Sequence, residues 1–402
     1  MQRKLKVAVT VSHPIQHFCP QYESWAKYDG IELKVFFASA LGYKKYYDPN
    51  FRREVSWGNI RLENFDHLFL NGDEVLKSDN RLDAPIIESE LDKWSPDLVI
   101  MYGYNQPFQR KTCRWARRNN VKRAYISDGE LRQQRSVVKG ILKYPLLANY
   151  FSKINHFLTV GDANEAFYRN YGVPASKLVR MHFPIDIKGY SESFRKKAEL
   201  SDAIRKKFAI KKEDFVASVV GKLVPWKNQD HIIDAMQRLE SRGVNMHLFV
   251  LGSGELMQQW STKAASLKNS KVHFPGFVNI EELPSYYAAS NVYIHPASKE
   301  PHSLAISEAI YMECPVIISD RCGSHGENDD VQDGKNGFVY SFGNIDELAS
   351  KIELLQAHKE LQANFSAYSR KISVEFQKKA HGAFFEVIKN SANTMSPTKS
   401  AA

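Results

Sequence analysis

Short apolar runs alternate with longer amphipathic stretches twice along this chain, and no other feature of the sequence limits the fold as strongly. The runs that read as buried strands are residues 6–12, 31–39, 97–103, 122–127 and 156–160, and then 215–223, 246–254, 271–277, 292–297, 315–320 and 337–342. Strands that alternate with helices form a parallel sheet covered on both faces. The sequence therefore predicts an α/β protein with two doubly wound domains that face each other across a ligand-binding cleft.

The alternation pauses between residues 187 and 213, where the chain is highly charged and has no apolar run. We interpret residues 191–213 as a linker that carries one solvated helix. The two domains are then expected at residues 1–190 and 214–375. Residues 376–402 are expected to form a helix that could pack back on the first domain, followed by a disordered tail.

The composition is that of a folded protein with an excess of basic over acidic residues. Of the 402 residues, 43% are hydrophobic and 25% are charged, with a net charge of +10. A positive charge favours nucleic acids, phosphorylated small molecules or acidic membrane surfaces. The first apolar run is too short for a signal peptide, and no run is long enough to span a bilayer. We therefore expect a cytoplasmic protein with at most peripheral membrane contact.

The four cysteines, Cys19, Cys113, Cys314 and Cys322, have no metal-ligand spacing. They are expected to be reduced thiols packed in the interior.

Two glutamates eight residues apart, Glu300 and Glu308, flank the start of a helix expected over residues 303–313. Ser303 suits the N-cap, so the backbone N–H groups of residues 304–306 would be free to bind a diphosphate. The Glu308 carboxylate accepts hydrogen bonds only, which suits the hydroxyls of a ribose, and Glu300 could meet a group beyond the phosphates. The alternative is that Glu308 favours the helix dipole and that Glu300 is a solvated loop acid.

A second candidate group follows the first strand of the second domain. Gly221 permits close backbone approach, and Lys222 and Lys227 stand on the loop between strand and helix. Two cations at this position could bind a diphosphate from the side opposite residue 304. The alternative is a solvated lysine pair.

Several of these segments together resemble a known family. The segments are GKLVPWKNQDHIIDAM, VLGSGEL, VHFPGFV, SYYAASNVYIHPASKEPHSLAISEAIYMECPVIISD and DGKNGFVY, within residues 215–345. They are similar in order and spacing to retaining glycosyltransferase family four, the group 1 glycosyltransferases. The resemblance implies the GT-B fold of two facing Rossmann-like domains and transfer of a sugar from a nucleotide donor with retention of its configuration.

The resemblance also assigns roles. It implies that Glu308 holds the nucleotide ribose, that Glu300 lies by the donor sugar, and that positions 222 and 227 bind the diphosphate. Lys222 stands where the family usually has arginine, and His302 and Ser303 replace an aromatic residue and a glycine. These differences lie at the sugar and phosphate positions and leave the donor identity open. The predicted donor-binding set is Gly221, Lys222, Lys227, Glu300, His302, Ser303, Leu304 and Glu308.

The first domain resembles the family only weakly, so acceptor residues are predicted from position. His13, Gln16 and His17 follow the first strand and can hydrogen bond to sugar hydroxyls, although a packed strand-to-helix turn explains them equally well. Asp128 and Glu130 follow another strand and fall at cleft positions of an open sheet. We place Asp128 with Glu300, Lys227 and Lys222 in the predicted catalytic set, and His13, Gln16 and Glu130 on the acceptor side. Solvated turn acids are the competing interpretation for Asp128 and Glu130.

Residues 110–154 are basic and partly aromatic. Residues 110–123 alone contain seven lysines or arginines and no acid. Such a face suits an anionic membrane surface and would bring the enzyme to a lipid-linked acceptor, although a solvated basic helix is the simpler alternative. No nucleic-acid-binding motif accompanies the charge, so we do not expect a nucleic-acid partner.

Taken together, the sequence predicts a retaining transferase that moves a sugar from a UDP- or GDP-sugar to a glycan or lipid-linked glycan in bacterial surface polysaccharide synthesis. No cofactor beyond the nucleotide-sugar and no metal is expected. The alternatives are an inactive nucleotide-binding partner subunit of the same fold, a GT-B epimerase or phosphorylase, and a two-lobed solute-binding protein, which would need export.

Overall fold

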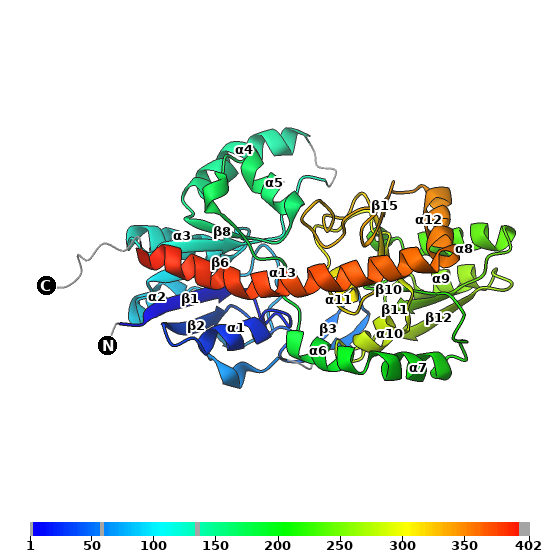
Figure 1. The fold of residues 1–402 in the computed structure, drawn as a ribbon. Coiled ribbons are helices and arrows are strands. Elements are labelled where there is room, and N and C mark those ends of the chain that lie inside the picture. Colours follow the sequence, from blue (N-terminus) through cyan, green and yellow to red (C-terminus); the bar gives the residue numbers. More distant parts are fainter. Residues whose placement is uncertain (1–2, 57–59, 133–136, 394–402) are drawn as a thin grey trace, which may run out of the picture.

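The computed structural model describes residues 3–56, 60–132 and 137–393 and divides into two α/β domains (Figure 1). The first-domain sheet has the strand order β5-β2-β1-β6-β7-β8-β9, and all its strand pairs are parallel. Its strands are β1 (Leu5–Val11), β2 (Ile31–Phe37), β5 (Asp66–Asp73), β6 (Leu98–Tyr102), β7 (Lys122–Ile126), β8 (His156–Thr159) and β9 (Leu178–Arg180). Its helices are α1 (Cys19–Ala26), α2 (Ile87–Trp94), α3 (Pro107–Arg118), α4 (Val137–Ser152) and α5 (Asp162–Asn170).

The second-domain sheet has the order β12-β11-β10-β13-β14-β15, again with parallel pairs. Its strands are β10 (Val216–Val220), β11 (His247–Leu251), β12 (Lys271–Gly276), β13 (Val292–His295), β14 (Val316–Ser319) and β15 (Gly337–Tyr340). Its helices are α8 (Asp230–Ser241), α9 (Met257–Ala264), α10 (Leu283–Ala289), α11 (Leu304–Tyr311) and α12 (Ile345–Ala357). The predicted fold of two facing Rossmann-like domains is confirmed.

Each sheet is buried on both faces, which explains why its strands read as continuous apolar runs. In β1, Val7 and Val9 belong to one core cluster while Ala8 belongs to the cluster on the opposite face. This alternation follows from the two-residue period of a strand. All eleven predicted strands are present. The sequence did not predict β5, which has acidic ends, β9, which has only three residues, or the short strands β3 (Tyr46–Asp48) and β4 (Arg53–Val55).

The segment predicted as a linker differs from the expectation. Residues 191–213 hold most of α6 (Ile187–Arg195) and all of α7 (Lys197–Lys207). Tyr190 of α6 and Ile204 of α7 are buried in the same core cluster as Tyr287 of α10. Most residues of these helices are charged, so the few apolar residues on one face were not recognised in the sequence. Because that apolar face packs in the core, both helices are part of the second domain.

Helix α13 (Lys359–Asn393) runs across both domains (Figure 1). Its 35 residues correspond to a length of about 50 Å. Ile372 and Phe376 pack in the second-domain core, whereas Phe384 and Val387 pack in the first-domain core. The ring of Phe384 stacks on that of Trp25, with centroids 3.8 Å apart. One helix therefore joins the two cores, and the predicted boundary at residue 375 falls in its interior.

Two further sequence expectations can be compared with the structure. The four cysteines are buried free thiols, as predicted. Among the described residues, we find no helix with the length and apolar character needed to cross a bilayer.

Candidate functional site

The carboxyl ends of the two sheets meet in direct contact. Arg132, which follows β7, donates hydrogen bonds of 3.0 Å to the backbone oxygens of Cys322 and His325 in the loop after β14. The backbone N–H of Asp162, which follows β8, donates to Asp329 of the same loop at 2.8 Å. Polar groups that follow the strands of the two domains therefore lie close together, as expected for parallel sheets that face each other.

Lys227 and Glu300 form an ion pair at this junction. Lys227 ends a 3₁₀ turn after β10 (Pro225–Lys227), and Glu300 lies in the loop between β13 and α11. His295 at the end of β13 donates to the same Glu300 oxygen at 3.1 Å through Nε2, and its Nδ1 accepts from the Tyr293 hydroxyl at 3.0 Å. Two of the predicted catalytic residues are therefore in contact, supported by a hydrogen-bonded chain from β13.

These contacts fix the charge of Glu300. Burial acts to raise the pKa of its carboxyl group, but the Lys227 charge and the His295 hydrogen bond lower that pKa to about 2. The backbone of Glu300 is also held, because its carbonyl accepts from Gly323 N–H at 2.8 Å. Any side chain at position 323 would meet the Pro301 oxygen at 1.9 Å, so a glycine is required there. Glu300 is thus held by its backbone and is ionised at neutral pH.

Lys222 has a partner from the other domain. Its Nζ lies 3.0 Å from Asp48 Oδ2, a residue of β3 (Tyr46–Asp48) in the first domain. The loop that carries Lys222 begins at Gly221, whose φ of +146° favours glycine. Both predicted diphosphate-binding lysines are therefore paired with carboxylates in this structure.

The start of α11 lies beside this group but differs in detail from the expectation. Ser303 occupies the N-cap position, yet its side chain makes no capping hydrogen bond, and its backbone N–H donates to Ser324 Oγ at 2.9 Å. Leu304, the first helical residue, is half-buried and packs against the second-domain core.

The His302 side chain pairs with two acids of the loop after β14. Its Nε2 lies 3.4 Å from Asp329 and 3.7 Å from Asp330, and all three side chains are buried. Burial acts to lower the pKa of His302, but the neighbouring carboxylates raise it, so the imidazole is stabilised as a cation.

His302, Asp329 and Asp330 are also the kinds of residue that bind metals, and their potential ligand atoms lie within 4.8 Å of one another. The Asp329 oxygens already accept from the backbone N–H groups of Asp330 and Asp162, and Asp330 accepts from the Ser307 hydroxyl at 2.6 Å. We interpret the group as an ion-paired cluster, and the expectation that no metal is needed stays a prediction.

Glu308 is buried behind the helix start. Its Oε2 accepts from the Tyr287 hydroxyl at 3.1 Å. Burial raises the pKa of its carboxyl group to about 7, and the nearby charge of Asp186 acts in the same direction. The sequence predicted a simple carboxylate acceptor, whereas the structure places a carboxyl group here that changes protonation near neutral pH.

Asp128 enters the site from the first domain. The residue has solvent-exposed surface, but the protein packed around its carboxyl group withdraws that group from water and raises its pKa; the charge of Glu300 adds to this effect, whereas His302 opposes it. Glu130 is buried against Gly323, and its carboxylate accepts from the Arg132 backbone N–H, so it supports the domain junction. Of the two predicted acids, Asp128 is therefore the one that solvent or a substrate can reach.

The loop after β1 reaches the site through a row of rings. His17 contacts Phe183 with ring centroids 5.6 Å apart, and Phe183 contacts His302 at 4.9 Å. His13 accepts or donates at 2.8 Å to the Ser12 hydroxyl, and burial lowers its pKa to about 4. Gln16 is half-buried, and its side-chain oxygen has no hydrogen-bond partner among the residues that the structure describes. The predicted acceptor residues His13 and Gln16 are thus neutral polar groups in the loop that reaches the site through His17.

Sequence reasoning missed several residues of this site. His295 could have been found, because it is the polar end of a buried strand at the cleft edge. Asp48 could not, since it lies 174 residues before Lys222 and belongs to no recognisable motif.

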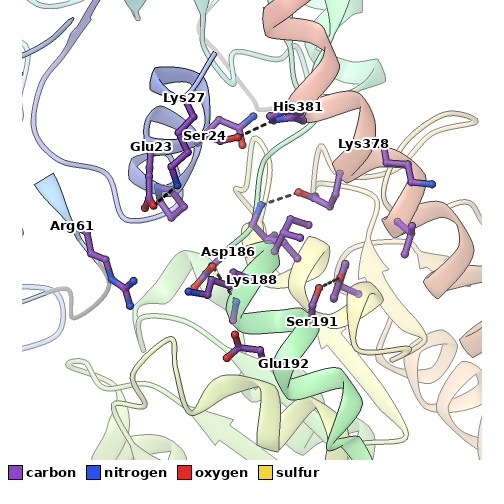
Figure 2. A pocket seen from close by; sticks show the side chains of 18 of the residues that line it. Glu23, Ser24, Lys27, Arg61, Asp186, Lys188, Ser191, Glu192, Lys378 and His381 are labelled. Atoms are coloured by element: carbon purple, nitrogen blue, oxygen red, sulfur yellow. Dashed lines mark hydrogen bonds and ion pairs between the residues drawn. The ribbon is translucent and has the colours of Figure 1, made fainter. Parts of the chain in front are cut away.

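A cavity of about 1100 Å³ lies elsewhere between the domains, bordered by α1, α6 and α13 (Figure 2). Acidic and basic side chains mix around it, including the paired Glu23 and Lys27 as well as Arg61, Lys188 and Glu192. Among the described residues that line it, none belongs to the predicted donor-binding set. It lies beside the two segments that connect the domains, near residues 185–195 and 374–382, and is separate from the site of Lys227 and Glu300.

The sequence is similar to known glycosyltransferases. Residues 201–372 match the family model described as glycosyl transferases group 1. EpsD of Bacillus subtilis, assigned as a glycosyltransferase, is 24% identical over 382 residues, which cover 94% of this chain and 93% of EpsD. A UDP-Gal:alpha-D-GlcNAc-diphosphoundecaprenol alpha-1,3-galactosyltransferase of Escherichia coli is 29% identical over 157 residues, or 39% of this chain and 40% of that protein.

The fold is also found among solved structures. The crystal structure of HepE from Anabaena in complex with UDP and glucose matches with a TM-score of 0.70 and 16% identity, covering 96% of this chain and 100% of HepE. These findings confirm the resemblance read from the sequence and the GT-B fold.

Proposed function

We propose that this chain, which the matches above indicate to be a group 1 glycosyltransferase, is a retaining enzyme that uses a nucleoside-diphosphate sugar. The observation that carries the proposal is the contact of Lys227 with Glu300 beside the start of α11, at the junction of the two domains. A lysine and a helix N-terminus bind phosphate, and an ionised carboxylate beside them binds sugar hydroxyls.

The donor would lie mainly on the second domain. Lys222 and Lys227 would contact the diphosphate, Glu300 the sugar and Glu308 the ribose. A UDP-sugar is the first donor to test, since HepE has been crystallised with UDP and glucose.

The low pKa of Glu300 bears on the mechanism. A carboxylate with a pKa of about 2 is a weak base and a poor nucleophile, so Glu300 is suited to orienting the sugar. We therefore propose that the departing β-phosphate oxygen accepts the proton of the acceptor hydroxyl, and that the new bond forms on the face that the nucleotide leaves. Lys222, Lys227 and the α11 start would stabilise the charge that develops on the diphosphate. Asp128, which solvent can reach from the first domain, would accept a hydrogen bond from the acceptor.

The acceptor is proposed to be a glycan or a lipid-linked glycan at the cytoplasmic face of a bacterial membrane. Helix α4 lies at the outer edge of the first domain (Figure 1). Its first turns expose apolar side chains to solvent. Val138 is 67% exposed, and Ile141, Leu142 and Leu146 are each 68% exposed. Lys143 is exposed among them. An apolar helix face with basic residues suits peripheral binding to anionic lipid, and the Escherichia coli relative is named for a diphosphoundecaprenol acceptor.

The stereochemistry of donor turnover tests this proposal. Glycosyltransferases hydrolyse their donors slowly when water replaces the acceptor. With UDP-glucose, UDP-galactose, UDP-N-acetylglucosamine and GDP-mannose in turn, proton NMR would identify the anomer of the free sugar that forms first. Retention predicts that the α-linked donor accepted by the enzyme releases the α anomer first. Release of the β anomer first would contradict the retaining mechanism, and turnover of no donor would contradict the proposed activity.

A further inference from the structure

A two-stranded hairpin of the first domain lies on the second domain at the proposed donor site. Strand β3 (Tyr46–Asp48) pairs antiparallel with β4 (Arg53–Val55), and these two strands form a sheet of their own. An isolated two-stranded hairpin is only marginally stable in water. The position of this hairpin, residues 46–55, therefore depends on what it packs against.

The hairpin contacts three loops of the second domain, each of which follows a strand. Asp48 pairs with Lys222 after β10 at 3.0 Å. The Phe51 backbone oxygen accepts from the Ser253 hydroxyl after β11 at 2.9 Å. The Arg53 guanidinium lies over the ring of Phe277 after β12, 4.6 Å from its centroid. All three loops lie at the ligand-binding edge of an open α/β sheet.

The chemistry of these contacts resembles that of a nucleotide. A carboxylate lies on the lysine proposed for the diphosphate, a carbonyl oxygen lies on a hydroxyl, and a flat cation lies on an aromatic face where a planar base could stack. Asp48 is 5% exposed, so its charge is directed to Lys222 and away from solvent. The lysine also lies over the Phe51 ring, 4.8 Å from its centroid.

We propose that the β3–β4 hairpin is an internal competitor of the donor: the Asp48 carboxylate occupies Lys222 until a donor phosphate displaces it. This proposal rests on the proposed function, because it needs a donor diphosphate that binds Lys222. The hairpin must then move aside for the nucleotide to enter, so donor affinity is set partly by the cost of releasing Asp48.

The test compares the affinities of three proteins for UDP and for GDP by calorimetric titration: the wild type, Asp48→Asn and Asp73→Asn. Asparagine at position 48 keeps the Oδ1 acceptor of the Asn50 and Phe51 backbone N–H groups and removes the charge. Asp73 is 79% exposed and pairs with Lys44, so Asp73→Asn makes the same change in net charge away from Lys222. One charge-assisted bond predicts that Asp48→Asn binds the nucleotide about tenfold more tightly, while Asp73→Asn binds as the wild type does.

The outcomes separate the two proposals. If the wild type and Asp48→Asn bind a nucleotide equally, or Asp48→Asn binds it more weakly, the competitor proposal is wrong while nucleotide binding stands. If none of the proteins binds either nucleotide, the proposed donor site itself fails.

Hydrogen exchange of the hairpin amides gives a second readout. The proposal predicts faster exchange at residues 46–55 of the wild type when the nucleotide is bound. Slower exchange would mean that the hairpin closes over the nucleotide, and would overturn the proposal.

Discussion

Replacing Glu308 by glutamine should raise stability and lower nucleotide affinity in the same protein. In the folded protein, burial raises the pKa of the Glu308 carboxyl group from 4.5 to about 7. A group whose folded pKa is raised contributes fully to stability below pH 4.5, and this contribution is lost as the pH rises through 7. A shift of this size corresponds to about 3 kcal/mol of folding free energy between those limits.

Glutamine resembles the protonated carboxyl group in shape and can still accept from the Tyr287 hydroxyl, but it does not ionise. Urea unfolding should therefore show less than about 1 kcal/mol difference between Glu308→Gln and the wild type at pH 5, and a gain of about 3 kcal/mol for Glu308→Gln at pH 8. Glu386→Gln, at an exposed position of α13, is the matched control and should follow the wild type at both pH values.

The same variant should bind its nucleoside diphosphate roughly tenfold more weakly at pH 8, because a charged acceptor for the ribose is lost. A gain in stability together with a loss of affinity is expected when a residue contributes to ligand binding and destabilises the fold. If Glu308→Gln has the same pH dependence of stability as the wild type, the assignment of a raised pKa is wrong. If its affinity is unchanged, Glu308 is a structural residue.

Two further predictions concern the catalytic lysine and the first-domain surface. Lys227→Ala should lower sugar transfer by roughly 100-fold or more, since one donor to the developing charge is removed, and should destabilise the fold by no more than about 3 kcal/mol. Lys227→Ala leaves the buried Glu300 charge without its lysine partner, so adding Glu300→Gln should restore part of the lost stability without restoring transfer. Full activity of Lys227→Ala would refute the role of Lys227. Replacing Ile141 and Leu142 together by serine should weaken sedimentation with anionic phospholipid vesicles at least tenfold while donor hydrolysis stays constant. Leu354→Ser, at a 40% exposed position of α12, is its control, and equal vesicle binding by all three proteins would exclude α4 as the membrane contact.

Most of the fold could be predicted from the sequence because both sheets are parallel and their central strands, such as β1, β6 and β13, are buried on both faces and are rich in apolar residues. The main error came from a segment in which only a few side chains are buried and most residues are charged. Residues 191–213 have so many charges that the stripe containing Ile204 is hidden in the pattern, although it packs in the second-domain core.

For the site, too, the sequence predicted some contacts and missed others. The contact between Lys227 and Glu300 could be expected, since both residues follow neighbouring strands of one sheet. The side-chain direction of His302 and the partner of Lys222 could not be expected, because they depend on Asp329 and Asp48, which the fold brings in from distant loops. The contact between Lys222 and Asp48 depends on how the two domains meet, and the contact between His302 and Asp329 joins two loops of the second domain. Neither contact leaves a local signal in the sequence.

The most direct test of a donor site built on Lys227 and Glu300 is a thermal-shift panel of the wild type and Lys227→Ala with UDP, GDP, dTDP, CMP and ADP. A ligand at 100 times its dissociation constant adds about 2.7 kcal/mol of stability, enough for a clear rise in the melting temperature. The account predicts that one nucleoside diphosphate raises the melting temperature of the wild type and that the rise is much smaller in Lys227→Ala. Equal rises in both proteins, or no rise with any nucleotide, would contradict it.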